Sequence, residues 1–280
     1  MQASTDRLAV LFDHRSADAF CHLADNLTEV IHLNLLAVMV DDAPEPVHKA
    51  RVALRRLRAC LKAFAPLLDD DFAEAMQDRA RSLFRLLGMA RDADVLALRF
   101  AGTERAAKLE AEAAHERQKM RKHLKRKKAE AFRPWVLRRL AGNTWRQTGK
   151  RAKALREAPV SVLAAMGMER AWKACIGHGP DLRVINARAQ HDLRKDLKTL
   201  RYLTEFFADL WPGIAQERFL DALRALQDDL GEITDSALAR ERGHLDEVDT
   251  KTPQDRAAMA WQVLQAEGPW WHEPRTETED

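Results

Sequence analysis

A strongly basic stretch, VHKARVALRRLRACLKAF, occupies residues 47–64 and occurs a second time further along the chain. Its apolar residues recur every three or four positions, which is the spacing of one face of an α-helix. A neighbouring face of this predicted helix collects side chains that are or can become cationic, namely His48, Arg51, Arg55, Arg58 and Lys62. Because like charges repel along a helix, a row of cations without acids indicates either a solvated surface face or a bound anion.

The second occurrence, HDLRKDLKTLRYLTEFF, spans residues 191–207 within a helix that we predict over 190–207. A shift of 143 positions aligns four cations of the first copy with four of the second, which are His191, Arg194, Lys198 and Arg201. The match continues without a gap to the Leu-Gly pairs at 87–88 and 230–231, and to Asp92 and Asp235. Self-similarity at so long a period indicates a duplicated unit, and the repetition of the row in both copies favours a bound anion.

The composition predicts a helical protein. The chain of 280 residues is 46% hydrophobic and 32% charged, with only 11 Gly and 10 Pro, and its apolar residues recur at helical rather than strand spacing. We therefore predict an all-α fold of two four-helix bundles, related by an internal pseudo-two-fold axis around a basic central groove or pore. The predicted parts are a first half over 1–155, a second half over 156–245 and an acidic, partly helical tail over 246–280.

Charge and cysteine content restrict the function classes further. The net charge is only +3, but the segment 121–128, RKHLKRKK, is densely basic and can be a solvated helix end or another wall of an anion site. The three cysteines form no CxxC pair, which argues against a disulfide framework or a zinc site. The first residues do not resemble a signal peptide, and the apolar run over 30–40 is too short to span a bilayer, so we expect a cytoplasmic protein.

Motifs for catalysis are weak in this sequence. The stretch GNTWRQTGK at 142–150 has the wrong glycine spacing for a phosphate loop, and neither HExxH nor GxSxG occurs. His48 and His191 each have an arginine one turn away, which disfavours a metal cation there. We expect Asp92 and Asp235 to hold arginine side chains rather than to catalyse. The sequence thus predicts a protein that is not an enzyme and needs neither a metal ion nor a cofactor.

Taken together, HKARVALRRLR, LLGMARDADV, HDLRKDLKTLRYLTEFF and LQDDLGEITD resemble the CHAD family, the conserved histidine α-helical domain. The resemblance extends from near the N-terminus to about residue 245. It implies two four-helix bundles whose basic helices line a central groove that binds inorganic polyphosphate. By position, it assigns polyphosphate binding to His48, Arg51, Arg55, Arg58, His191, Arg194, Lys198 and Arg201. We expect Lys62 to join them, because it lies on the same basic face. Further anion contacts are expected from Lys49, Arg121, Lys125 and Lys195.

The second basic helix departs from this pattern, because Asp192 and Asp196 lie on it and Glu205 replaces the cation that corresponds to Lys62. We therefore expect the second half to contribute less positive potential. The predicted partner is inorganic polyphosphate, including that of polyphosphate granules, and not a membrane. Two alternatives stay open, a nucleic-acid-binding helical module and an accessory domain of a phosphate-processing enzyme. The first is disfavoured because the basic faces have no aromatic stacking platform.

Overall fold

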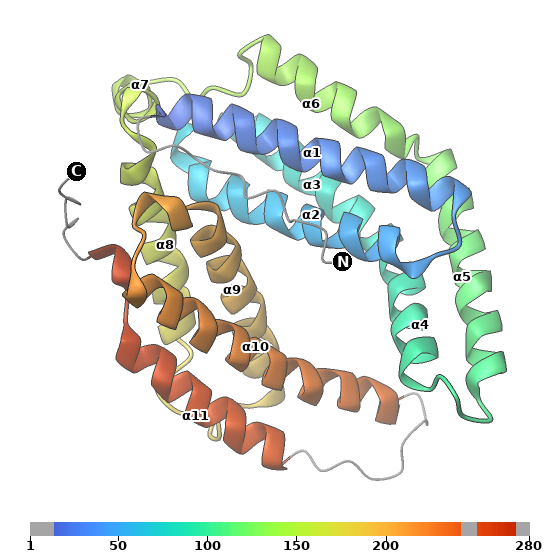
Figure 1. Cartoon of the computed structure of the whole chain (residues 1–280). Helices are drawn as coiled ribbons and strands as arrows, with labels where there is room; N and C mark the ends of the chain where they lie inside the picture. The colour runs from blue at the N-terminus through green and yellow to red at the C-terminus, as the bar shows by residue number, and fades with distance from the viewer. Residues whose placement is uncertain (1–13, 242–250, 273–280) are drawn as a thin grey trace. The chain divides into compact units, whose positions relative to one another are not determined.

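The computed structural model describes residues 14–241 and 251–272, with the side chains of 234–241 and 251 outside the description. Within these ranges the chain is all-helical (Figure 1) and contains no strand. An isolated bridge joins Leu68 and Arg146. The described residues divide into two compact units, an N-terminal unit over 15–158 and a C-terminal unit from Pro159 onward, to which His14 also belongs. The predicted all-α class is therefore confirmed.

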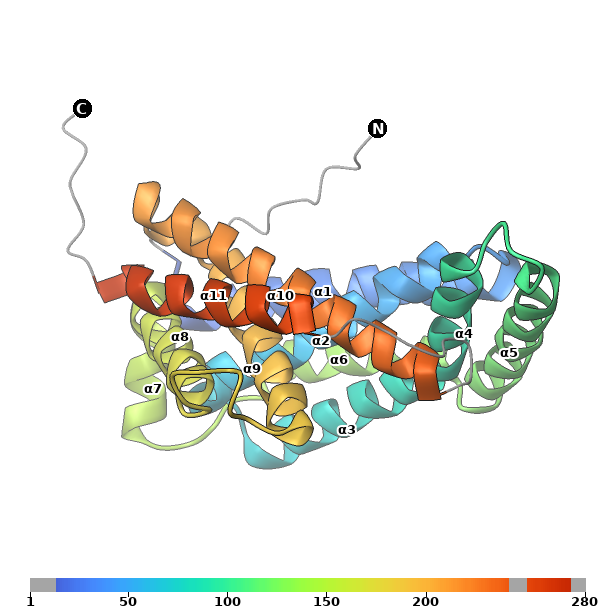
Figure 2. The same cartoon turned by 90° about the horizontal axis from the view of Figure 1, so that it is seen from below.

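The N-terminal unit holds seven of the described α-helices. Their bounds are α1 (Ser16–Val40), α2 (Pro44–Phe64), α3 (Asp70–Leu86), α4 (Gly88–Arg99), α5 (Ala106–Arg126), α6 (Phe132–Ala141) and α7 (Lys150–Glu157). Helix α1 packs along α2 on one side and against α6 on the other, and α4 pairs with α5 (Figures 1 and 2). Short 3₁₀ turns follow α2, as η1 (Ala65–Leu67), and precede α6, as η2 (Ala129–Ala131).

An aromatic cluster fills the centre of the N-terminal unit. The ring of Phe20 lies 5.6 Å from Phe64, 6.4 Å from Phe72 and 4.9 Å from Trp145, measured between centroids. All four side chains are fully buried, so α1, α2, α3 and the segment after α6 share one core. Helix starts follow local signals, because Pro44 occupies the first turn of α2 and the Asp69 carboxylate accepts the Phe72 N–H at the start of α3.

The C-terminal unit contains α8 (Val160–Ile176), α9 (Ala187–Phe206), α10 (Ile214–Glu241) and α11 (Lys251–Glu267), with the 3₁₀ turns η3 (Ala208–Leu210) and η4 (Trp270–His272). Helix α8 packs on α9, and α10 packs on both α9 and α11. Trp172 lies 5.7 Å from Phe219 and 6.1 Å from Trp261, and these rings are buried. In the predicted tail, α11 and η4 both pack on α10, whereas 246–250 and 273–280 lie outside the described residues.

The two sequence copies differ where their Leu-Gly pairs lie. In the first copy, Leu87 lies between the end of α3 and Gly88, which begins α4. In the second copy, Leu230 and Gly231 lie inside the continuous helix α10. The repeat in sequence is therefore not a strict repeat in structure, and the arrangement as two symmetric four-helix bundles stays a prediction.

Helix α1 is longer than the apolar run over 30–40, which forms its C-terminal part. It has 25 residues and a mean hydropathy of 1.3 in its most apolar window, so it is long and apolar enough to cross a membrane. Its residues Phe20, Leu27 and Ile31 are nevertheless buried in the core of the N-terminal unit. A buried core helix of a globular unit meets the same criterion, and one such helix is weak evidence for a membrane span.

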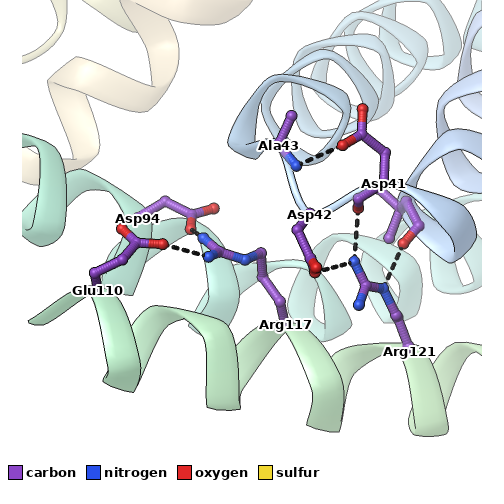
Figure 3. A network of polar contacts seen from close by, with 8 residues as sticks. Asp41, Asp42, Ala43, Asp94, Glu110, Arg117 and Arg121 are labelled. Atoms are coloured by element: carbon purple, nitrogen blue, oxygen red, sulfur yellow. Dashed lines mark hydrogen bonds and ion pairs between the residues drawn. The ribbon is translucent and has the colours of Figure 1, made fainter.

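Two arginines on one face of α5 fasten this helix to the rest of its unit (Figure 3). Arg117 forms an ion pair with the buried Asp94 of α4 and donates to Glu110 at 2.6 Å. Arg121, one turn later, donates to the carbonyl oxygens of Val38 and Asp41 at 2.7 and 2.6 Å. Since those carbonyls end α1, Arg121 satisfies acceptors that a helix C-terminus leaves open.

Removal of either partner of the Arg117–Asp94 ion pair should strongly destabilise the protein. Replacement of Asp94 by Ala leaves the buried Arg117 without its α4 partner, and we expect a loss of about 3–5 kcal/mol in the free energy of unfolding. Urea unfolding of the wild type and Asp94→Ala measures this loss. As a control, Asp94→Leu combined with Arg117→Met should recover most of the stability, because no buried charge remains. A loss below about 1 kcal/mol in Asp94→Ala would contradict the assignment.

Candidate functional site

The predicted basic row lies on α2 as the spacing indicates. His48, Arg51, Arg55 and Arg58 are half-buried and Lys62 is exposed, while the apolar face between them and α1 is buried. The helix extends three residues further toward the N-terminus than predicted, because Pro44 rather than Pro46 starts it. The row is thus a partly desolvated surface, where charges interact more strongly than in open water.

Arg51 is held by protein groups. Its Nη1 atom donates to the carbonyl oxygen of Phe84 at 3.0 Å, and its guanidinium lies 4.0 Å from the centroid of the Phe84 ring. Phe84 is near the end of α3, where the last carbonyls have no partner within the helix. A Cβ atom on Gly88 would lie 3.0 Å from Nη1 of Arg51, so the glycine leaves the space that the guanidinium occupies.

Neighbouring helices add two cations that the sequence did not single out. Arg91 of α4 lies close enough to lower the pKa of His48, after the larger effect of burial. Arg81 of α3 likewise lowers the pKa of Arg58, again after burial. The sequence repeat could have indicated Arg81, because this residue aligns with Arg224 in the second copy. It could not have indicated Arg91, because only the next residue, Asp92, aligns with an identical one.

Burial also lowers the pKa of Arg51, to about 10. Asp92 opposes this shift, and Arg55 and Arg91 add to it. Asp92 was expected to hold an arginine side chain, and it does lie near Arg51. The hydrogen bond of Arg51 goes to the Phe84 carbonyl, however, and the side chain of Asp235 lies outside the described residues.

In the C-terminal unit, Arg194 of α9 corresponds to Arg51 and also donates to a backbone carbonyl of a neighbouring helix. Its Nη1 atom donates to the carbonyl oxygen of Leu230 in α10. A Cβ atom on Gly231 would lie 3.6 Å from Nη1 of Arg194, which is an ordinary contact. In the repeat, Leu230 corresponds to Leu87 rather than to Phe84, so the accepting carbonyl is displaced by three residues. The difference follows from the unbroken course of α10.

Acids on α9 neutralise part of its basic row. Glu205 lies 3.4 Å from Nε of Arg201, Asp192 accepts from Lys195 at 2.8 Å, and the Asp196 carboxylate lies 3.0 Å from His178. The remaining members of the row are the exposed His191 and the half-buried Lys198. The Arg201–Glu205 pair reduces the net charge of the C-terminal row, and the weaker potential expected from Asp192, Asp196 and Glu205 stays a prediction.

The additional anion contacts predicted from sequence lie in varied surroundings. Lys49 lies 3.6 Å from Glu45, and Lys195 is paired with Asp192. Arg121 is engaged with the end of α1 as described above. Lys125 lines a hollow of about 250 Å³ beside Leu36 and Met39 rather than joining the α2 row. Within the described ranges, no group of three His, Cys, Asp or Glu side chains is placed to hold a metal ion.

The fold and the site thus define a class of all-helical protein in which a basic helix occurs twice. In each copy, an arginine of that helix donates to a backbone carbonyl of a neighbouring helix. A family model for the CHAD domain matches residues 22–244, so the chain belongs to the CHAD domain family, a family of polyphosphate-binding type. A search of curated proteins found no match.

Solved structures show the same fold. The crystal structure of the CHAD domain from the plant Ricinus communis is 23% identical, covers 96% of both chains and superposes with a TM-score of 0.72. PptA from Streptomyces chartreusis is 17% identical, covers 92% of this chain and 100% of its own, and has a TM-score of 0.51. At these identities, the two structures establish the fold of the chain and not its ligand.

The two glycines should respond differently to alanine. Gly231→Ala should stabilise the protein by about 0.5–1 kcal/mol, because alanine loses less backbone entropy in a helix. Gly88→Ala should lack this gain, because Gly88 is the first residue of α4 and its Cβ, 3.0 Å from Nη1 of Arg51, would shift that guanidinium and weaken its hydrogen bond to the Phe84 carbonyl, at a cost of up to about 1 kcal/mol. Chemical unfolding of both variants measures the difference.

Arg51→Ala provides the control for Gly88. In that background the guanidinium is gone, and Gly88→Ala should then stabilise the protein as Gly231→Ala does. Equal stabilisation by both glycine replacements in the wild-type background would show that Arg51 is not held against Gly88.

Proposed function

We propose that the protein binds inorganic polyphosphate without catalysis, through the cations of α2 and, more weakly, those of α9. The observation that supports this most directly is the half-buried α2 row, to which Arg91 of α4 adds charge. Arg81 of α3 also faces this row, although it is paired with Asp78 at 2.6 Å. Among the described residues Arg58 forms no ion pair with a carboxylate, although like charges surround it. A bound polyanion would offset this repulsion.

The chemistry of the row suits a flexible chain of phosphates. Arginine is always charged and offers a planar fork that engages two oxygens at once. A polyphosphate chain presents no base or ring, so repeated charge-assisted hydrogen bonds are the available means of recognition. The spacing of one helical turn between successive cations places Arg55 and Arg58 side by side for neighbouring phosphates.

The cations divide into two roles under this proposal. Arg51 and Arg194 mainly position helices, since each donates to a backbone carbonyl. Arg55 and Arg58 on α2, with Lys198 and Arg201 on α9, are the principal ligand contacts, supplemented by His48, His191 and Lys62. The proposal that both rows line one shared groove rests on the duplication in the sequence.

Three further proposals follow from polyphosphate as ligand. The protein would act in the cytoplasm and could associate with polyphosphate granules there. It could also serve a phosphate-processing enzyme as an accessory domain that supplies the substrate. Nucleic acid is the competing ligand, because it carries the same phosphate charge, and the first experiment below distinguishes the two.

Removal of two charges from α2 should weaken polyphosphate binding strongly. We expect Arg55→Gln with Arg58→Gln to reduce the affinity for long-chain polyphosphate at least tenfold, about 1.4 kcal/mol. The slope of log K against log salt should fall by about 0.7 for each cation removed. Titration calorimetry at two salt concentrations measures both quantities, with single-stranded RNA of equal charge as the competing ligand.

The matched variant Lys198→Gln with Arg201→Gln removes the same two charges from α9. It should lose less affinity, because Glu205 already offsets Arg201. Equal affinity for RNA and polyphosphate would favour the nucleic-acid alternative. Wild-type affinity in the α2 variant would refute the proposed site, and phosphate release during the titration would indicate an enzyme.

Binding should take up protons at His48. Burial and Arg91 lower the pKa of this side chain, so the free protein holds it mostly neutral near pH 7. A polyanion nearby favours the imidazolium and raises the pKa, so affinity should increase from about pH 8 to about pH 6. Calorimetry in buffers of different ionisation heat measures the proton uptake, and His48→Gln should reduce it. Uptake that is unchanged in His48→Gln would rule out this residue.

A further inference from the structure

A second cluster of arginines lies on the N-terminal unit, away from the α2 row. The guanidinium carbon of Arg79, on α3, lies 4.4 Å from the centroid of the Trp135 indole. That of Arg139, one turn after Trp135 on α6, lies 5.9 Å from the same centroid. Two cations from different helices thus converge on one aromatic ring, and the exposed Arg138 precedes Arg139 on α6.

The indole itself is fixed and covered. The ring of Phe72 stacks on Trp135 at a centroid distance of 6.0 Å and an angle of 11° between the planes. Phe72 belongs to the central aromatic cluster, so Trp135 is anchored to the core. With Phe72 stacked on it and Arg79 at 4.4 Å, the ring offers little free surface for a nucleobase. What the cluster presents outward is guanidinium charge.

Acids of the described part of the chain do not pair with these arginines. Among the residues that the structure describes, Arg79, Arg138 and Arg139 form no ion pair with a carboxylate. The acids at the start of α3, Asp70 and Asp71, do not pair with them either. The Nε atom of Arg139 is also buried without a hydrogen-bond partner. The case for the cluster rests on the convergence of two guanidinium groups on one ring and not on this buried atom, which solvent does not reach.

We propose that Arg79, Arg138 and Arg139 form a second phosphate-binding site, on the α3–α6 face of the N-terminal unit. The inference rests on the proposed function and extends it, because the site would hold a further stretch of a polyphosphate chain bound at α2. Arg79 and Arg81 are two residues apart on α3, so they point in directions about 200° apart around the helix. The two sites therefore lie on different faces of α3, with Arg81 facing Arg58 and Arg79 facing Trp135.

The arrangement makes affinity depend on chain length. A short chain such as tripolyphosphate can occupy one site at a time. A long chain can pass around α3 and occupy both, at a distance of about 16 Å for half the circumference of a helix about 10 Å across. Binding at the first site then raises the effective concentration of phosphate at the second.

The experiment compares long-chain polyphosphate with tripolyphosphate by titration calorimetry at two salt concentrations. Arg79→Gln with Arg139→Gln should weaken long-chain binding at least fivefold and lower the salt slope by about 1.4, for two cations at about 0.7 each. Arg79→Lys with Arg139→Lys keeps both charges and should retain most of the affinity. The control Arg15→Gln with Arg183→Gln removes two exposed, acid-paired arginines and should remain within twofold of the wild type.

A second measurement needs no variant. Modification of wild-type arginines by an arginine-selective dicarbonyl reagent, mapped by mass spectrometry, should show that long-chain polyphosphate protects Arg79 and Arg139 while Arg183 stays reactive. Undiminished long-chain affinity in the glutamine variant, or unprotected Arg79 and Arg139, would overturn the inference and leave these arginines as clamps on Trp135.

The outcomes separate the two proposals. Loss of affinity in the α2 variant with none in the Arg79–Arg139 variant would support the proposed function and overturn the second site. Loss only in the Arg79–Arg139 variant would overturn the α2 site and support the second one. Absence of any polyphosphate binding by the wild type would overturn both.

Discussion

A guanidinium that reaches from the basic helix to a backbone carbonyl of a neighbouring helix organises each unit. Arg51 makes this contact with the end of α3, and Arg194 makes it with α10. A charged donor that satisfies a carbonyl contributes more than a neutral one, and its loss would leave the acceptor open. The contact sets the distance between helices, so the remaining cations of each row are presented from a fixed backbone.

The same geometry explains the electrostatic cost of the α2 row. His48, Arg55 and Arg58 are half-buried beside Arg81 and Arg91, and this surface departs from the mixed charges of ordinary helix surfaces. Burial lowers the pKa of His48 and Arg58, and Arg91 and Arg81 add to the two shifts, while Glu45 opposes the shift at His48. Proteins retain such arrangements at functional sites, where a ligand supplies the missing charge.

Periodicity in the sequence predicted the helical class, the position of α2 and the shared face of its cations, because each depends on local spacing alone. The sequence showed that the Leu-Gly pairs are repeated but not what they do. Gly88 leaves space for the guanidinium of Arg51, which belongs to another helix. The contribution of Arg91 was missed for a similar reason, because it depends on how α4 packs beside α2. Contacts between helices are set by tertiary packing, which spacing along one helix does not report.

The two copies of the repeat have diverged in a way that follows from backbone continuity. Where the chain breaks at Gly88, the end of α3 leaves a carbonyl for Arg51 and α4 turns Arg91 toward the row. Where α10 continues through Gly231, Arg194 uses a carbonyl three residues later in the repeat. The second row also carries Glu205 and the other acids on α9, so we expect its field to be weaker. A duplicated site can therefore keep the docking contact in both halves while the N-terminal half retains most of the charge that a polyanion would meet.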